Sequence, residues 1–90
     1  MKLHHKGFML VLLEKMQLAW DDVLVDLALQ EYMLTGRYWN NHFRIILEEL
    51  AAAGLITREA HHLDSKTDRL VFQYAISNFG RERMRDTGLL

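Results

Sequence analysis

Cysteine and proline are both absent from this chain. Without cysteine there can be no disulfide, no thiolate nucleophile and no zinc or iron–sulfur site that uses thiolate ligands. Long apolar runs are missing as well, because the longest, from Phe8 to Leu13, has six residues, whereas a membrane-spanning helix needs about 20. The sequence therefore predicts a cytoplasmic protein that does not contact a membrane.

Charge of one sign is not in excess either. The 90 residues carry a formal net charge of −1, and half of them are apolar, which is typical of a single folded domain over residues 1–90. Acids outnumber bases by two in residues 1–36, and bases outnumber acids by one in residues 37–90. Any anion-binding surface is therefore expected in the second part, although mixed charges also serve simply to solvate a surface.

The first half of the chain predicts helices. Leucine and methionine dominate the stretch from Lys6 to Met16, which favours a buried helix over a strand. Apolar side chains point to all sides of this helix, so we expect part of it to contact a second copy of the chain in a homodimer. A second helix is predicted from Asp22 to Met33, with Asp21 as its N-cap.

A turn containing Gly36 separates the second helix from a third, which is predicted over residues 37–53. Gly54 then stands where a left-handed C-terminal cap is expected. Apolar residues recur at steps of three and four and share one buried face: Phe43, Ile46, Leu47 and Leu50. The opposite face should present four polar residues to solvent: Asn40, Asn41, Arg44 and Glu48.

After Gly54 the composition changes to residues typical of strands. Leu55 to Thr57 and Arg69 to Ser77 flank a polar turn over residues 64–68, which predicts a β-hairpin. Ser77 is then the expected N-cap of a short helix that ends at about Asp86. Most aromatic side chains, Phe79 among them, are expected in the core.

This order of elements resembles a winged helix-turn-helix domain. The segment from Leu50 to Ile56 is similar to the end of the recognition helix in MarR-type and PadR-type bacterial transcriptional regulators, in which a leucine and three further residues precede Gly-Leu-Ile. Asp68-Arg69 resembles the wing signature of the MarR type, and the segment from Tyr74 to Arg81 is similar to the one that closes the wing in both. The resemblance implies an α+β winged helix-turn-helix fold with a three-helix core, a two-stranded β-hairpin wing and a short C-terminal helix. It also implies a regulator of transcription that binds double-stranded DNA, in which Asp68 pairs with Arg69.

On such a fold the third helix enters the major groove, where short polar side chains and arginine meet the base edges. Asn40, Asn41 and Arg44 are therefore candidate base contacts. Thr35 and Arg37 stand beside the helix N-terminus and are candidate phosphate contacts. The alternative is a helix face that is merely solvated.

The predicted wing supplies three further cations, Arg58, Lys66 and Arg69, as candidate contacts to the sugar–phosphate backbone. The alternative for these residues is protection of an exposed strand edge against aggregation.

Tyr38, Trp39 and Ile45 stand where a DNA-reading helix usually has small polar or basic residues. They favour a second hypothesis, in which the same fold binds another protein and not DNA. A continuous positive surface over the third helix and wing would favour DNA, and a patchwork with exposed aromatic side chains would favour the protein partner.

Metal binding and catalysis find no support in the sequence. His4-His5 and His61-His62 are pairs of adjacent residues, and neighbours on a strand point to opposite faces, so His61 and His62 cannot readily share one ion. No phosphate-binding loop, nucleophile elbow or metalloprotease motif is present. We therefore predict neither an enzyme nor a cofactor or metal site.

Overall fold

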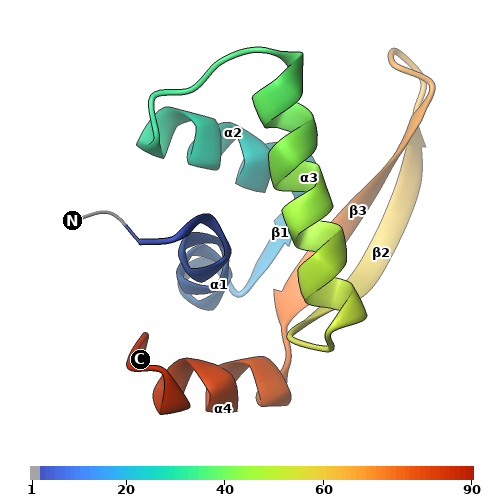
Figure 1. The fold of residues 1–90 in the computed structure, drawn as a ribbon. Helices are drawn as coiled ribbons and strands as arrows, with labels where there is room; N and C mark the ends of the chain where they lie inside the picture. The colour runs from blue at the N-terminus through green and yellow to red at the C-terminus, as the bar shows by residue number, and fades with distance from the viewer. Residues whose placement is uncertain (1–2) are drawn as a thin grey trace.

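Figure 1 shows the fold in the computed structural model, which describes residues 3–90. Helices and strands follow one another as α1 (His5–Met16), β1 (Leu18–Trp20), α2 (Asp21–Glu31), α3 (Arg37–Ala52), β2 (Ile56–Asp64), β3 (Arg69–Ile76) and α4 (Asn78–Asp86). The three strands form an antiparallel sheet in the order β1-β3-β2. The α+β class predicted from the sequence is confirmed.

Helix α1 lies in the middle of the helical part of the molecule (Figure 1). Met9, Leu10 and Leu13 are buried. The other three residues of the apolar run are partly buried and pack against the same core: Phe8, Val11 and Leu12. This is possible because α2, α3, α4 and β3 all contact α1. The apolar run therefore needs no second copy of the chain to cover it. The homodimer stays a prediction, but the apolar residues of α1 no longer support it.

Helices α2 and α3 begin within one residue of the predicted positions. The predicted face of α3 is buried, and Gly54 ends the helix at a φ of 79°, with the Leu55 N–H donating to the Leu50 carbonyl at 3.0 Å. Asp21 is not the N-cap of α2 as predicted, because Trp20 holds that position. The Asp21 carboxylate instead accepts the Phe72 N–H of β3 at 3.2 Å.

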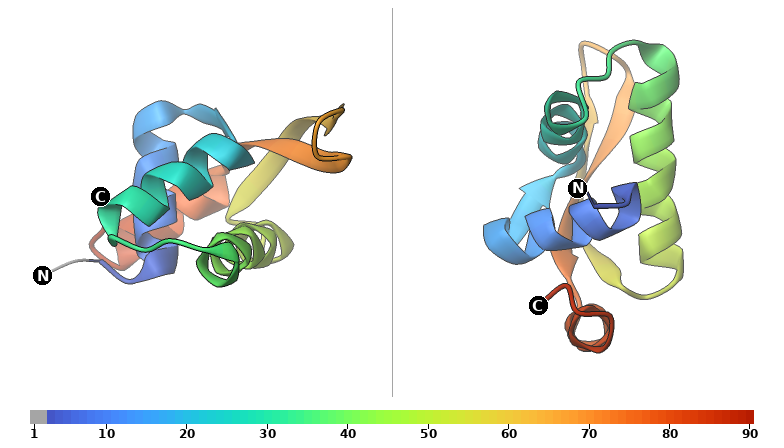
Figure 2. Two further views of the ribbon diagram at one scale, coloured as in Figure 1. Left: turned by 90° about the horizontal axis from the view of Figure 1, so that it is seen from above. Right: turned by 60° about the vertical axis from the view of Figure 1, so that its left-hand side comes forward.

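The hairpin of β2 and β3 extends away from the helices (Figure 2). Its paired residues run from Ile56 opposite Ile76 to Asp64 opposite Arg69, with one irregularity between Arg58 and Ala60. The turn of the hairpin and the start of α3 lie toward the same end of the molecule (Figure 1). This arrangement leaves the hairpin and the outer face of α3 accessible together.

The third strand, β1, was not predicted. It pairs with the other edge of β3, with Ala19 opposite Tyr74. Three residues are too few for a pattern of alternating apolar residues to show in the sequence, so only the pairing reveals this strand.

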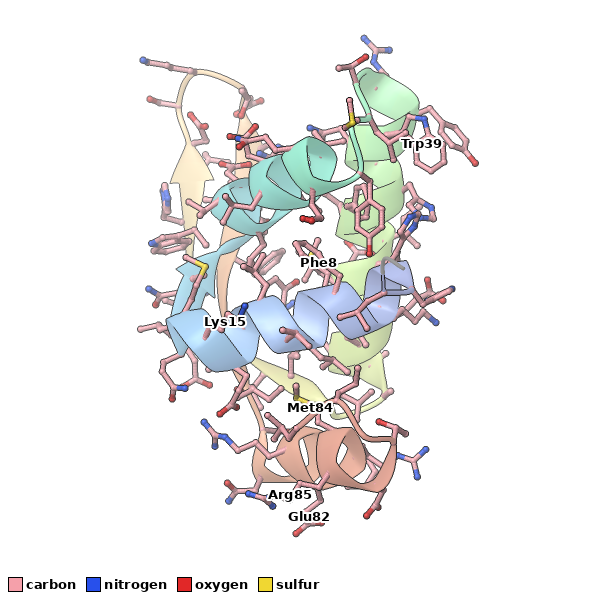
Figure 3. All side chains as sticks on the ribbon, turned by 90° about the vertical axis from the view of Figure 1, so that its left-hand side faces the viewer. Phe8, Lys15, Trp39, Glu82, Met84 and Arg85 are labelled. Atoms are coloured by element: carbon pink, nitrogen blue, oxygen red, sulfur yellow. The ribbon has the colours of Figure 1, made fainter. Side chains whose placement is uncertain are left out.

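Helix α4 begins as predicted, since Ser77 Oγ accepts the Gly80 N–H at 2.8 Å. Phe79 was predicted in the core, but it is 51% exposed. The buried residues of α4 are Gly80 and Met84, which share one face of the helix, and Phe79 lies off that face. Met84 points toward α1 in Figure 3, whereas Glu82 and Arg85 point away.

Candidate functional site

The outer face of α3 carries side chains of different chemical types. The exposed ones along its length include Arg37, Tyr38, Asn41, Ile45 and Glu48, and Tyr38 is 71% and Ile45 54% exposed. The first turns thus offer a cation and an amide, whereas the later turns offer an isoleucine and a carboxylate. This face is a patchwork of charge and apolar groups and is not continuously positive.

Arg44 was predicted to face solvent, but it turns toward α2. Its Nε donates to Asn40 Oδ1 at 2.8 Å and its Nη2 to Asp22 Oδ1 at 2.7 Å. Its Nη1 lies 3.4 Å from Asp21 Oδ1, and only 20% of the side chain is exposed. The prediction of an open Arg44 is wrong, because two aspartates at the start of α2 attract the guanidinium. Asn40 is half-buried and contributes its amide oxygen to the same contact.

Arg69 reaches the same two aspartates from β3. Its Nη2 donates to Asp22 Oδ1 at 2.6 Å, and its Nη1 lies 3.9 Å from Asp21 Oδ2. The carboxylates paired with Arg69 are therefore those of α2, not the carboxylate of Asp68 that the resemblance implied. We call Asp21, Asp22, Arg44 and Arg69 the Asp–Arg cluster. It joins α2, α3 and the first residue of β3, next to the turn of the hairpin.

The two aspartates of the Asp–Arg cluster differ in environment. Asp21 is buried, with 7% of its side chain exposed, whereas 46% of the Asp22 side chain is exposed. Partial burial raises the pKa of Asp22, but the hydrogen bonds and positive charges of Arg44 and Arg69 outweigh it and hold the pKa below the ordinary 3.8. Asp22 is therefore ionised at neutral pH, and two acids balance two bases in the cluster.

Sequence reasoning missed both aspartates as parts of this surface. In the sequence they are two adjacent acids at the start of a predicted helix, and this pattern does not indicate which residues they pair with. Arg44 and Arg69 follow Asp22 by 22 and 47 residues, so only the fold brings them together.

Arg58 and Lys66 lie on the hairpin, as predicted. The Arg58 guanidinium stands 4.2 Å from the centre of the Phe72 ring, and its Nε donates to the Tyr74 hydroxyl at 3.2 Å. Such stacking holds a cation in place without neutralising its charge. Lys66 is exposed in the turn, where its N–H donates to Asp64 Oδ1 at 2.9 Å.

The N-terminus of α3 is open to solvent. Gly36 precedes it with a φ of 100° and no side chain caps the helix. Thr35 and Arg37, the two predicted phosphate contacts, flank this glycine and are both exposed. Free N–H groups and one cation therefore lie together here, which suits an anion.

The same end of α3 contacts the start of α1 through a pair of histidines. His5 Nδ1 lies 2.9 Å from His42 Nε2, and the Trp39 ring contacts the rings of both. Burial, and then the charges of His42 and His4, lower the pKa of His5 below 6.5. Trp39 is accordingly only partly exposed, and Tyr38 is the open member of the predicted aromatic pair.

Residues 3–90 contain no group of three or more histidine or acidic side chains arranged to hold a metal ion. Nor does any helix in that range have the length and apolar character to cross a membrane. A hollow of about 470 Å³ between α2 and α3 borders the Asp–Arg cluster and is lined by Asp22, Val23, Asp26, Leu27, Asn40 and Arg44. Comparison with protein families, with curated proteins and with solved structures finds no match for this chain.

Proposed function

We propose that this chain is a winged helix-turn-helix domain that binds double-stranded DNA, as part of a small regulator of transcription. In this proposal α3 enters the major groove and the hairpin follows the sugar–phosphate backbone. The observation that carries the proposal is one of shape. The exposed outer face of α3 and the projecting hairpin lie beside each other, with the start of α3 and the hairpin turn toward one end of the molecule (Figures 1 and 2).

The residues that remain free define the contacts. Asn41 is exposed on the first half of α3 and can read a base edge, because its amide both donates and accepts. Arg37, with the open helix N-terminus and Thr35, contacts a phosphate. Arg58 and Lys66 contact the backbone from the hairpin. Arg44 and Arg69 are occupied by aspartates and do not support the proposal in this state.

We expect weak DNA binding with a moderate dependence on salt, because few cations on this surface are left without a neutralising carboxylate. Arg37, Arg58 and Lys66 give a slope of about −3 for the logarithm of the association constant against the logarithm of salt concentration, because each neutralised phosphate contributes about −0.9. A strongly basic DNA-binding domain has a steeper slope.

The test is a fluorescence anisotropy titration of a random-sequence duplex at several salt concentrations. Lys66→Ala should weaken binding to every sequence and reduce the slope by about one, since one phosphate contact is lost. Lys15→Ala is the matched control, because Lys15 is exposed near the end of α1 and well separated from the hairpin turn (Figure 3). Equal losses for the two variants, or no binding of duplex by the wild type at low salt, would refute the proposal.

A second candidate function is contact with another protein through α3. The observation that favours it is the exposure of Tyr38 and Ile45, at 71% and 54%, on a helix face that also shows Glu48. By the criterion given in the sequence analysis, this patchwork favours a protein partner over a polyanion, whereas the position of the hairpin beside α3 supports DNA. The titration separates the two candidates, since a protein-contact surface predicts no salt-dependent binding of duplex at all.

A further inference from the structure

Two guanidinium groups from different elements converge on one carboxylate oxygen. Asp22 Oδ1 lies 2.7 Å from Arg44 Nη2 on α3 and 2.6 Å from Arg69 Nη2 on β3. A backbone phosphate, like a carboxylate, is an oxyanion that arginine binds with charge-assisted hydrogen bonds. The two guanidiniums thus form a site whose chemistry also suits a phosphate oxygen.

The position held by Asp22 is open to a ligand, whereas that of Asp21 is closed. The Asp22 side chain is 46% exposed and borders the hollow of about 470 Å³ between α2 and α3. Asp21 is buried and is held by the N–H of Phe72. Asp22 can therefore leave the arginines by rotating into solvent, but Asp21 cannot.

Asp21 also keeps the arginines in place when Asp22 leaves. Its carboxylate oxygens lie 3.4 Å from Arg44 Nη1 and 3.9 Å from Arg69 Nη1, while Asn40 accepts from Arg44 Nε. Each guanidinium therefore retains a contact through Nη1, whereas its contact with Asp22 is through Nη2. Without Asp22, two cations face one fixed anion, which leaves a single positive charge directed at the vacated position.

We propose that Arg44 and Arg69 form a binding site for a backbone phosphate of DNA, and that Asp22 occupies this site as an internal competitor until the phosphate displaces it. The inference rests on the proposed function, because it requires DNA to lie against α3 and the hairpin. It assigns a role to the two predicted cations that the unbound protein neutralises. It also predicts that Asp22 limits the affinity of the wild type.

The experiment compares Asp22→Asn with Asp26→Asn in titrations of the same random-sequence duplex. Both substitutions change the formal net charge from −1 to 0, and both residues lie on α2, one turn apart. Asp26 is the control because its carboxylate accepts a hydrogen bond from Gln30 and forms no ion pair within residues 3–90. Asparagine at position 22 keeps an oxygen that can accept from both arginines, so we expect the local fold to be retained.

Asp22→Asn should bind more tightly than the wild type, with a salt slope steeper by about one, because loss of the Asp22 charge leaves one net positive charge to neutralise a phosphate. Its advantage over the wild type should then shrink about three- to fourfold between about 50 and 200 mM salt. Asp26→Asn should leave the slope unchanged. If the two variants show the same affinity and slope, the gain reflects net charge alone and the inference is wrong, whereas the proposed function stands.

Failure of the proposed function gives a different result, in which none of the three proteins binds duplex at about 50 mM salt. A measurement on the wild type covers the case in which Asp22→Asn does not fold. The NMR signals of the Arg44 and Arg69 side-chain N–H groups should shift when duplex is added, because their acceptor changes from carboxylate to phosphate. Unchanged signals at saturation would overturn the inference.

Discussion

A single methyl group at Gly80 should separate α4 from the rest of the molecule. A Cβ atom built on Gly80 would lie 2.1 Å from the backbone oxygen of Leu55, far inside normal contact distance. That oxygen cannot easily move, because it accepts hydrogen bonds from the Ser77 N–H at 3.1 Å and from Ser77 Oγ at 2.9 Å. Gly80→Ala must therefore push α4 outward or break these bonds.

The magnitude follows from two opposing effects. Replacing a glycine inside a helix by alanine stabilises the helix by about 0.5–1 kcal/mol, but forcing an extra group into a packed site costs about 1–3 kcal/mol, occasionally more. With an overlap against backbone, we expect the second effect to prevail and the free energy of unfolding to fall by about 2 kcal/mol. For a domain of this size that corresponds to a loss of about 8–16 °C in melting temperature.

Gly7→Ala is the matched control, because a Cβ atom there would meet the Leu89 side chain at 3.7 Å, an ordinary contact. It should raise the free energy of unfolding by about 0.5–1 kcal/mol. Urea unfolding followed by circular dichroism measures both variants. If Gly80→Ala is as stable as Gly7→Ala, the reasoning about the Leu55 oxygen is refuted.

Two further predictions concern charged and titratable groups. The lowered pKa of His5 means that the unfolded chain takes up a proton first as the pH falls, so the free energy of unfolding should decrease below about pH 6.5 toward the folded pKa. His5→Gln should remove this decrease in urea unfolding curves recorded from about pH 8 to about pH 5, and a curve that keeps the wild-type pH dependence would contradict the assignment. Asp21→Ala should lower the free energy of unfolding by about 3 kcal/mol, because it removes the buried carboxylate that lies 3.4 Å from Arg44 Nη1 and leaves the Phe72 N–H without its acceptor. A loss below about 1 kcal/mol, typical of an exposed ion pair, would show that Asp21 is not needed there.

The sequence predicted the ends of helices correctly where they depend on only a few neighbouring residues. Gly54 and Ser77 marked the end of α3 and the start of α4 correctly, because capping depends on atoms within one turn. The three-residue strand β1 was missed, since its partner Tyr74 lies 55 residues beyond Ala19 in the chain and a strand this short has no pattern of its own. Phe79 was placed in the core because aromatic residues are usually buried there, but the face that α4 turns inward decides its exposure.

The sequence predicted where the residues of the candidate site lie, but not which of their charges are neutralised. Arg44 and Arg69 were identified as surface cations from their place on the third helix and on the hairpin. Their pairing with Asp21 and Asp22 could not be predicted, because electrostatic attraction acts through space and carries no trace in the spacing of residues along the chain. Asn41 and Lys66 are exposed, as predicted.

The sequence by itself determined where this chain forms helices and a hairpin, and which side of the third helix is apolar, because those properties depend on neighbouring residues. Only the tertiary structure decided which charges remain free, because it brings the start of α2, the middle of α3 and the turn end of the hairpin within hydrogen-bond distance. At that distance two of the predicted cations are neutralised by aspartates that lie far from them in the chain.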